Sequence, residues 1–292
     1  MSDFDRNYAA TRRFGADRAV AIDAGLRAHM IRVYNYMAAG VALTGVAAWL
    51  TFQLAVTTTS TGALALTPFG HAIYGTPLTW VLMLAPLGLV FFLSFRINSL
   101  SASTARALFF VYAASLGLSL SVIFLVYTHA SITRVFFISA AAFGALSLWG
   151  YSTQRDLSAF GSFLIMGLFG IIIAGLVNIF LHSSQLDWII SVIGVIVFAG
   201  LTTWDTQKIK EMYEPMDDGT VAGRKAVMGA LALYLDFINL FLSLLHLFGV
   251  VVLSRTSRMR LSGFHGLRIK VVPSGRLADK GNALPEPMMI SR

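Results

Sequence analysis

The chain has no cysteine among its 292 residues, and it has few charged residues. Without cysteine it cannot form disulfides or iron–sulfur clusters and cannot use a thiol in catalysis, although the compartment stays undetermined. Charged residues make up 12% of the sequence, against roughly 25% in a soluble domain. Hydrophobic residues make up 57%, and the mean hydropathy is +0.73. The composition therefore excludes an ordinary soluble globular protein.

Motifs of the common catalytic and nucleotide-binding sites are also missing. The chain has no Walker A sequence, no HExxH, no GxSxG and no glycine-rich dinucleotide fingerprint. It also lacks the GxGD signature of intramembrane proteases. We therefore predict that the protein is not an enzyme and has no cofactor. An intramembrane hydrolase that uses two acids is the weakest of the hypotheses that the sequence allows.

Long apolar stretches dominate the sequence instead. Most of them have about the 20 residues that cross the hydrocarbon core of a bilayer. The first follows an arginine-rich segment but has no small-residue cleavage pattern after it, which indicates an uncleaved anchor rather than a signal peptide. We predict an all-α, polytopic integral membrane protein with seven hydrophobic helices, at about residues 33–54, 79–95, 107–127, 132–150, 160–181, 186–205 and 228–253.

The distribution of basic residues predicts three regions and an orientation. Residues 1–32 form a basic segment with six arginines, residues 33–253 form the membrane domain, and residues 254–292 form a basic tail that we expect to be disordered. By the positive-inside rule, the N-terminus and the basic loops are cytoplasmic. The net charge of +8 therefore reflects membrane topology, and we predict no nucleic-acid partner.

The last apolar stretch leaves two topologies open. Seven full crossings would place 13 of the 22 lysines and arginines inside and 9 outside. A last segment that re-enters the membrane and returns would place 21 inside and 1 outside. The positive-inside rule is a bias, and charges after the last span carry less weight than early ones. Either topology is compatible with a polar residue midway along this segment.

One acid interrupts the last apolar stretch. Asp236 lies within LYLDFINLFLSLLHLFGVVVL, residues 233–253, where an aspartate costs roughly 2.5 to 3.5 kcal/mol and marks a functional site by default. Asn239, Ser243 and His246 follow at helical spacing, so the four residues form one polar stripe. Asn239 and Ser243 are equally well explained as hydrogen-bonding groups between helices. His246 can titrate near neutral pH, but a lone histidine on a helix is often simply hydrogen-bonded.

A second acid ends the sixth apolar stretch. Asp205 lies in VIVFAGLTTWDTQKIK, three residues before Lys208. If the sixth and seventh helices form an antiparallel hairpin, Asp205 and Asp236 lie at similar depths. Two carboxyl groups that meet in a poorly solvated place tend to share one proton, which makes such a pair a natural pH sensor. Alone, Asp205 is close enough to the helix end for an ordinary polar role. Arg96, at the end of the second stretch, is either an interfacial cation or a counter-ion for an acid.

Three segments together carry a resemblance to a known family. SVIGVIVFAGLTTWDTQKIK, LALYLDFINLFLSLLHLFG and LRAHMIRVYNYMAAGVALTGVAAWL closely resemble the bacterial, YccA-like branch of the Bax inhibitor motif family, over about residues 26 to 253. The resemblance implies seven helices with the last one central. It also implies a pH-sensitive calcium leak through paired aspartates, which correspond to Asp205 and Asp236, and an arginine partner, for which Arg96 is the candidate. Where relatives have arginine in the LLRLFG string, this chain has His246.

The residues and the resemblance together lead to a functional hypothesis. We expect a pH-sensitive calcium leak channel of the bacterial inner membrane, gated by Asp205 and Asp236, with calcium as the permeant ion and the lipid bilayer as its partner. The two carboxyl groups would bind calcium weakly and transiently, because no cage of six to eight oxygens is visible. The alternative is a regulator without transport activity that binds a membrane AAA protease or another stress-related partner.

Overall fold

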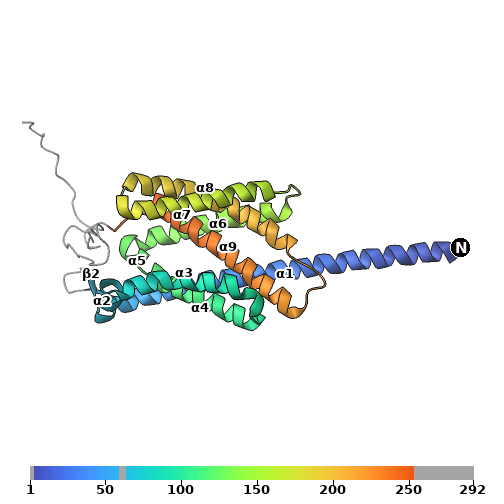
Figure 1. Ribbon diagram of the computed structural model, residues 1–292, viewed down its shortest axis with the longest axis horizontal. Helices are drawn as coiled ribbons and strands as arrows, with labels where there is room; N and C mark the ends of the chain where they lie inside the picture. The colour runs from blue at the N-terminus through green and yellow to red at the C-terminus, as the bar shows by residue number, and fades with distance from the viewer. Residues whose placement is uncertain (1–2, 59–63, 253–292) are drawn as a thin grey trace, which may run out of the picture.

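The structure is a computed structural model that describes residues 3–58 and 64–252, with side chains described from residue 24 onward. It is a bundle of long helices (Figure 1). Within the described residues, seven helices are long and apolar enough to cross a membrane. This confirms the predicted all-α polytopic membrane protein. The long helices are α1 (Asp3–Ala55), α3 (Leu78–Arg96), α4 (Ala102–Leu120, continued by α5, Ile123–Val126), α6 (His129–Ser152), α7 (Ser158–Leu181), α8 (Ser184–Glu211) and α9 (Gly219–Phe248).

The first helix is longer than the sequence predicts. We expected a basic segment up to residue 32 and a helix from residue 33, whereas α1 is continuous from Asp3 and its candidate membrane span begins at Ala24. Met30 and Val33 are buried, while Arg32 between them is exposed. Helical spacing thus places the apolar residues of this segment against the bundle and a charge on the opposite face.

Helix α9 lies at the centre of the bundle, as the family resemblance implies. It packs against α8, α1, α6 and α4, and it crosses the middle of the bundle in Figure 1. Of its most apolar 18-residue window, 67% is buried, compared with 11–39% for the other six spans. Leu233 and Tyr234 are completely inaccessible. The mostly apolar surface of α9 suits this place, because most of it meets other helices.

A small structured region connects the first two spans, and the sequence did not predict it. Strands β1 (Val56–Thr58) and β2 (Leu64–Leu66) pair antiparallel, and helix α2 (Pro68–Gly75) follows. Thr67 caps α2 by accepting a hydrogen bond from the Gly70 N–H at 3.0 Å. The Tyr74 hydroxyl shares a 2.7 Å hydrogen bond with Ser121, which fixes α2 to the end of α4. Burial raises the pKa of Tyr74, and the hydrogen bond to Ser121 partly opposes this.

The two ends of the bundle are held by different contacts. At the end that contains residues 212–218 between α8 and α9, here called the loop end, Arg224 donates to the carbonyl of Asn98 in the short helix η1 (Ile97–Ser99). At the opposite end, here called the far end, Val252 N–H donates to the Val126 carbonyl at 2.8 Å. Thr128 N–H donates to the Val250 carbonyl at 3.0 Å. Burial raises the pKa of Tyr127 at this end, and the charge of Asp187 acts in the same direction.

These end contacts bear on the two topologies that the sequence left open. Helix α9 begins at the loop end and continues for 30 residues, and the residues directly after it pair with the connection between α5 and α6 at the far end. At 1.5 Å per residue, a helix of this length spans about 45 Å, which exceeds the roughly 30 Å hydrocarbon core of a bilayer. The helix does not turn back on itself, so the structure favours seven crossings.

Single cysteines can test the seven crossings, because the natural chain contains none. Met216 at the loop end is 84% exposed and Val250 at the far end is 57% exposed. We expect Met216→Cys and Val250→Cys to react with a membrane-impermeant maleimide from opposite faces, in intact cells compared with inverted vesicles. The cysteine-free parent provides the background. Labelling of both positions from the same face would show that α9 re-enters.

Candidate functional site

The two acids are positioned by the hairpin of α8 and α9. Near the loop end, Gly229 of α9 makes room for Ile209 of α8, because a Cβ at Gly229 would lie 3.1 Å from two carbons of that side chain. Nearer the far end, Gly194 of α8 faces Ser243 of α9, where a Cβ would lie 2.6 Å from the hydroxyl oxygen. Each glycine lets the two helices approach closely. Asp205 and Asp236 lie between these two close contacts on their helices.

The structure brings the carboxyl groups of Asp205 and Asp236 into contact. Asp236 is only 4% exposed, and Asp205 is partly buried. The two side chains are close enough for a hydrogen bond between their carboxyl groups. An ionised carboxylate can only accept hydrogen bonds, so a bond between two carboxyl groups requires a proton on one of them. Asp236 Oδ2 has no hydrogen-bond partner in the described part of the chain. The geometry therefore fits one proton held between two acids.

Hydroxyl groups near the pair are committed to other partners. Thr202 and Thr206, on either side of Asp205 in α8, donate to the carbonyls of Phe198 and Thr202, each at 2.7 Å. Thr206 also shares a 2.9 Å hydrogen bond with Ser147 of α6. These bonds hold α8 against α6 and satisfy the hydroxyl groups. The hydrogen bonds of these hydroxyl groups lead to carbonyls and to other hydroxyl groups, and within the described residues none leads to Asp205 or Asp236.

The cation that acts on the pair is Lys208, one helical turn after Asp205. Its charge is felt by the Asp205 carboxyl, and its Nζ lies 4.8 Å from the centre of the Trp204 ring. Arg96, the candidate counter-ion from the sequence, is exposed at the end of α3. Among the described residues it makes no ion pair with either acid. Its role as a counter-ion stays a prediction.

The rest of the polar stripe extends along α9 toward the far end. Asn239 is partly buried, and its amide donates to the Leu235 carbonyl at 2.8 Å. Ser243 is partly buried and faces Gly194 of α8. His246 is exposed in the last turn of α9, about 15 Å of helix rise from Asp236. The structure therefore keeps Ser243 at the interface with α8 and places His246 outside it. Their functional roles stay predictions.

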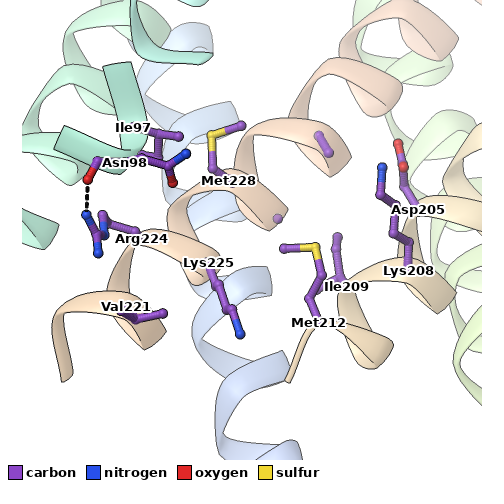
Figure 2. Close-up of a pocket in the computed structure, with 12 residues that line it drawn as sticks. Ile97, Asn98, Asp205, Lys208, Ile209, Met212, Val221, Arg224, Lys225 and Met228 are labelled. Atoms are coloured by element: carbon purple, nitrogen blue, oxygen red, sulfur yellow. Dashed lines mark hydrogen bonds between the residues drawn. The ribbon is translucent and has the colours of Figure 1, made fainter. Parts of the chain in front are cut away.

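A cavity of about 340 Å³ opens beside Asp205 at the loop end. Its lining comes from η1, α8 and α9, and Figure 2 shows Asp205 and Lys208 on one side and Arg224 with Asn98 on the other. The sequence did not predict this cavity or a place for Arg224 and Lys225 in it. The sequence feature that could have indicated a charged site here is the helical spacing of Lys208 from Asp205, which places the two side chains on the same side of α8. Among the described residues, no three His, Asp or Glu side chains gather as a metal site.

Comparisons with known proteins agree with this architecture. Residues 26–251 match the family model described as Inhibitor of apoptosis-promoting Bax1. The chain is 48% identical over 249 residues to a protein of Rickettsia prowazekii (strain Madrid E), covering 85% of this chain and 98% of that protein. It is 46% identical over 236 residues to the inner membrane protein YbhL of Escherichia coli (strain K12), covering 80% of this chain and 96% of that protein. A protein of Caulobacter vibrioides is 42% identical over 251 residues, covering 85% and 98%.

Proposed function

The chain belongs to the Bax inhibitor-1 family of membrane proteins, and from this membership and the joined acids we propose that it is a pH-sensitive calcium leak channel. The observation that carries the proposal is the contact between Asp205 and Asp236 inside the membrane domain. An acid this deep in a bundle lowers the stability of the fold, so its presence indicates a function. A proton shared by two acids converts a change of pH into a change of charge at the bundle core.

The proposed mechanism begins with the charge of the pair. Loss of the shared proton leaves two negative charges in contact, which repel each other and attract Lys208 more strongly. This change biases α8 and α9 toward a different packing, because a ligand or a proton shifts an equilibrium toward the state that binds it better. Calcium prefers carboxylate and carbonyl oxygens, and the two acids offer a weak, transient site for it. Calcium is the cargo here and not a resident ion.

We place the protein in the inner membrane of a bacterium with its N-terminus in the cytoplasm. The name of YbhL supports the inner membrane, and the six arginines of residues 1–32 support the cytoplasmic N-terminus. In this orientation the loop end and its cavity face the cytoplasm. With seven crossings, the residues after α9 would begin on the opposite side.

A liposome assay tests the proposed function directly. The purified full chain is reconstituted into vesicles loaded with a calcium indicator, and calcium flux is followed at several pH values. We expect flux above that of protein-free vesicles, and we expect its rate to change with pH. Flux no greater than in protein-free vesicles at any pH would reject the channel proposal.

Lys208 should set the pH at which the flux responds. We expect Lys208→Gln to move the midpoint of the pH response upward by roughly one pH unit, because an acid pair without a neighbouring cation keeps its proton to higher pH. The matched control is Lys210→Gln, since Lys210 donates to the Tyr151 carbonyl at 3.0 Å instead of facing the pair. An unchanged midpoint in Lys208→Gln would show that this lysine does not act on the acids.

A regulator without transport activity is the second candidate function. It is favoured by one observation: the family match ends at residue 251, while the chain continues with eight further basic residues. Such a tail suits a binding partner, for example a membrane-bound protease. In this case, removal of residues 254–292 would abolish regulation of the partner, and the Asp205 and Asp236 variants would keep it. The channel proposal predicts the opposite dependence for calcium flux.

A further inference from the structure

The cavity at the loop end contains more positive than negative charge. Lys208, Arg224 and Lys225 line it, and Asp205 is the acid in its wall. Lys225 is neutralised by Asp217 at 2.6 Å, and Lys208 faces Asp205. Arg224 has only the carbonyl of Asn98 as a hydrogen-bond acceptor among the described residues. A carbonyl carries no charge, so the guanidinium charge of Arg224 is left without an anion.

Arg224 is also the side chain best suited to hold an anion here. A guanidinium group has five N–H donors in a planar fork, and this fork matches the oxygens of a phosphate group. One donor is used on Asn98. In Figure 2, Arg224 lies with Asn98 at one side of the cavity, and Lys208 lies at the other side beside Asp205. The remaining N–H donors of Arg224 can hold an anion at its own side of the cavity.

The rest of the lining is apolar. Met212, Met228 and Ile209 form much of the wall, and Gly229 and Ala232 add no polar side chain. A wall of this kind suits the carbon skeleton of a phosphate ester better than a fully hydrated ion. The cavity also lies where α8 ends and α9 begins, at the boundary of two candidate membrane spans. The ends of membrane spans are where we expect the lipid headgroups of a bilayer.

We propose that the loop-end cavity binds a phosphate group, held by Arg224 and packed against the apolar wall of α8 and α9. The group is a phosphodiester of a membrane lipid or a free phosphate, which share the same chemistry at the guanidinium. Phosphate binding does not rest on the proposed channel function.

The test measures binding by the purified full chain in two arms. In the first, inorganic phosphate is titrated in detergent, and binding is followed by the rise in the unfolding temperature and by tryptophan fluorescence, to which Trp204 beside Lys208 contributes. In the second, the protein is reconstituted in vesicles of phosphatidylcholine with phosphatidylglycerol, extracted, and examined for retained phospholipid by native mass spectrometry. We expect Arg224→Gln to weaken binding about tenfold.

Matched variants separate a site from general charge. Arg106→Gln removes an exposed arginine of α4 that donates to the Tyr36 hydroxyl at 3.5 Å and lies outside the cavity lining, so it should bind as the natural chain does. Arg224→Lys keeps the charge without the fork and should bind with intermediate strength. Binding only in the first arm identifies free phosphate, and binding only in the second identifies lipid. Lack of binding in both arms, or equal binding by Arg224→Gln and Arg106→Gln, overturns the proposal.

If Arg224→Gln does not yield folded protein, Arg224→Lys replaces it as the test variant, and it should still bind more weakly than Arg106→Gln. Calcium flux is measured separately on the same samples. A chain that binds phosphate but shows no flux would retain this proposal and lose the channel proposal. A chain that shows pH-dependent flux but binds neither probe would retain the channel proposal and lose the phosphate proposal.

Discussion

Replacement of Asp236 by asparagine is expected to abolish the pH dependence of calcium flux. One titrating proton can change an equilibrium by at most about tenfold per pH unit, and we expect the natural chain to approach this slope near its midpoint. In Asp236→Asn the amide can donate to the Asp205 carboxylate without an added proton. The contact between α8 and α9 is then kept, while the proton that switches it is lost. The flux of the variant should vary by less than about twofold over the same pH range.

Three further variants make this expectation specific. Asp205→Asn should give the same loss, because the two acids share one proton and neither titrates in the same way without the other. The double variant should be no worse than either single one, since residues that act as a unit are not additive. Asp156→Asn is the matched control: Asp156 is exposed and accepts a hydrogen bond from the Ser158 N–H at 2.8 Å, away from the acid pair. A normal pH profile in Asp236→Asn would reject proton sharing as the switch.

The sequence predicts the membrane fold well because the bilayer imposes simple requirements. Long apolar stretches are sufficient to identify the seven spans, and an acid within one of them marks the site. The sequence also predicts similar depths for Asp205 and Asp236 if the sixth and seventh helices form an antiparallel hairpin. The structure confirms the central place of α9 and has the two acids close together.

The parts that the sequence could not predict depend on long-range packing. Arg96 ends the second span, and the burial of Leu93 and Ile97 on the inner face of the same turn leaves Arg96 exposed. Charge counting left the path of the last helix open, whereas the backbone pairing of Val252 with Val126 favours a full crossing. The loop-end cavity is lined by η1, α8 and α9, segments about 100 residues apart, and no local sequence pattern predicts it.

Substitution of Gly150 by alanine should destabilise the bundle and disturb the acid pair together. Gly150 of α6 is buried against α8, and a Cβ there would overlap the Thr203 carbonyl oxygen and lie 3.0 and 3.1 Å from the carbonyl carbon and Cα. These atoms belong to backbone, so neither helix can give way by rotating a side chain. The helices must separate, at a cost of about 1 to 3 kcal/mol.

Gly144 on the same helix gives a matched control, because a Cβ at that position meets nothing within 4 Å. Gly144→Ala should be neutral or stabilising by up to about 1 kcal/mol, the usual advantage of alanine over glycine in a helix. The two variants should therefore differ by about 1 to 4 kcal/mol in thermal unfolding in detergent. Thr203 is two residues from Asp205, so only Gly150→Ala should also shift the midpoint of the pH response. Equal stability of the two variants would show that close contact between α6 and α8 does not hold Asp205 in place.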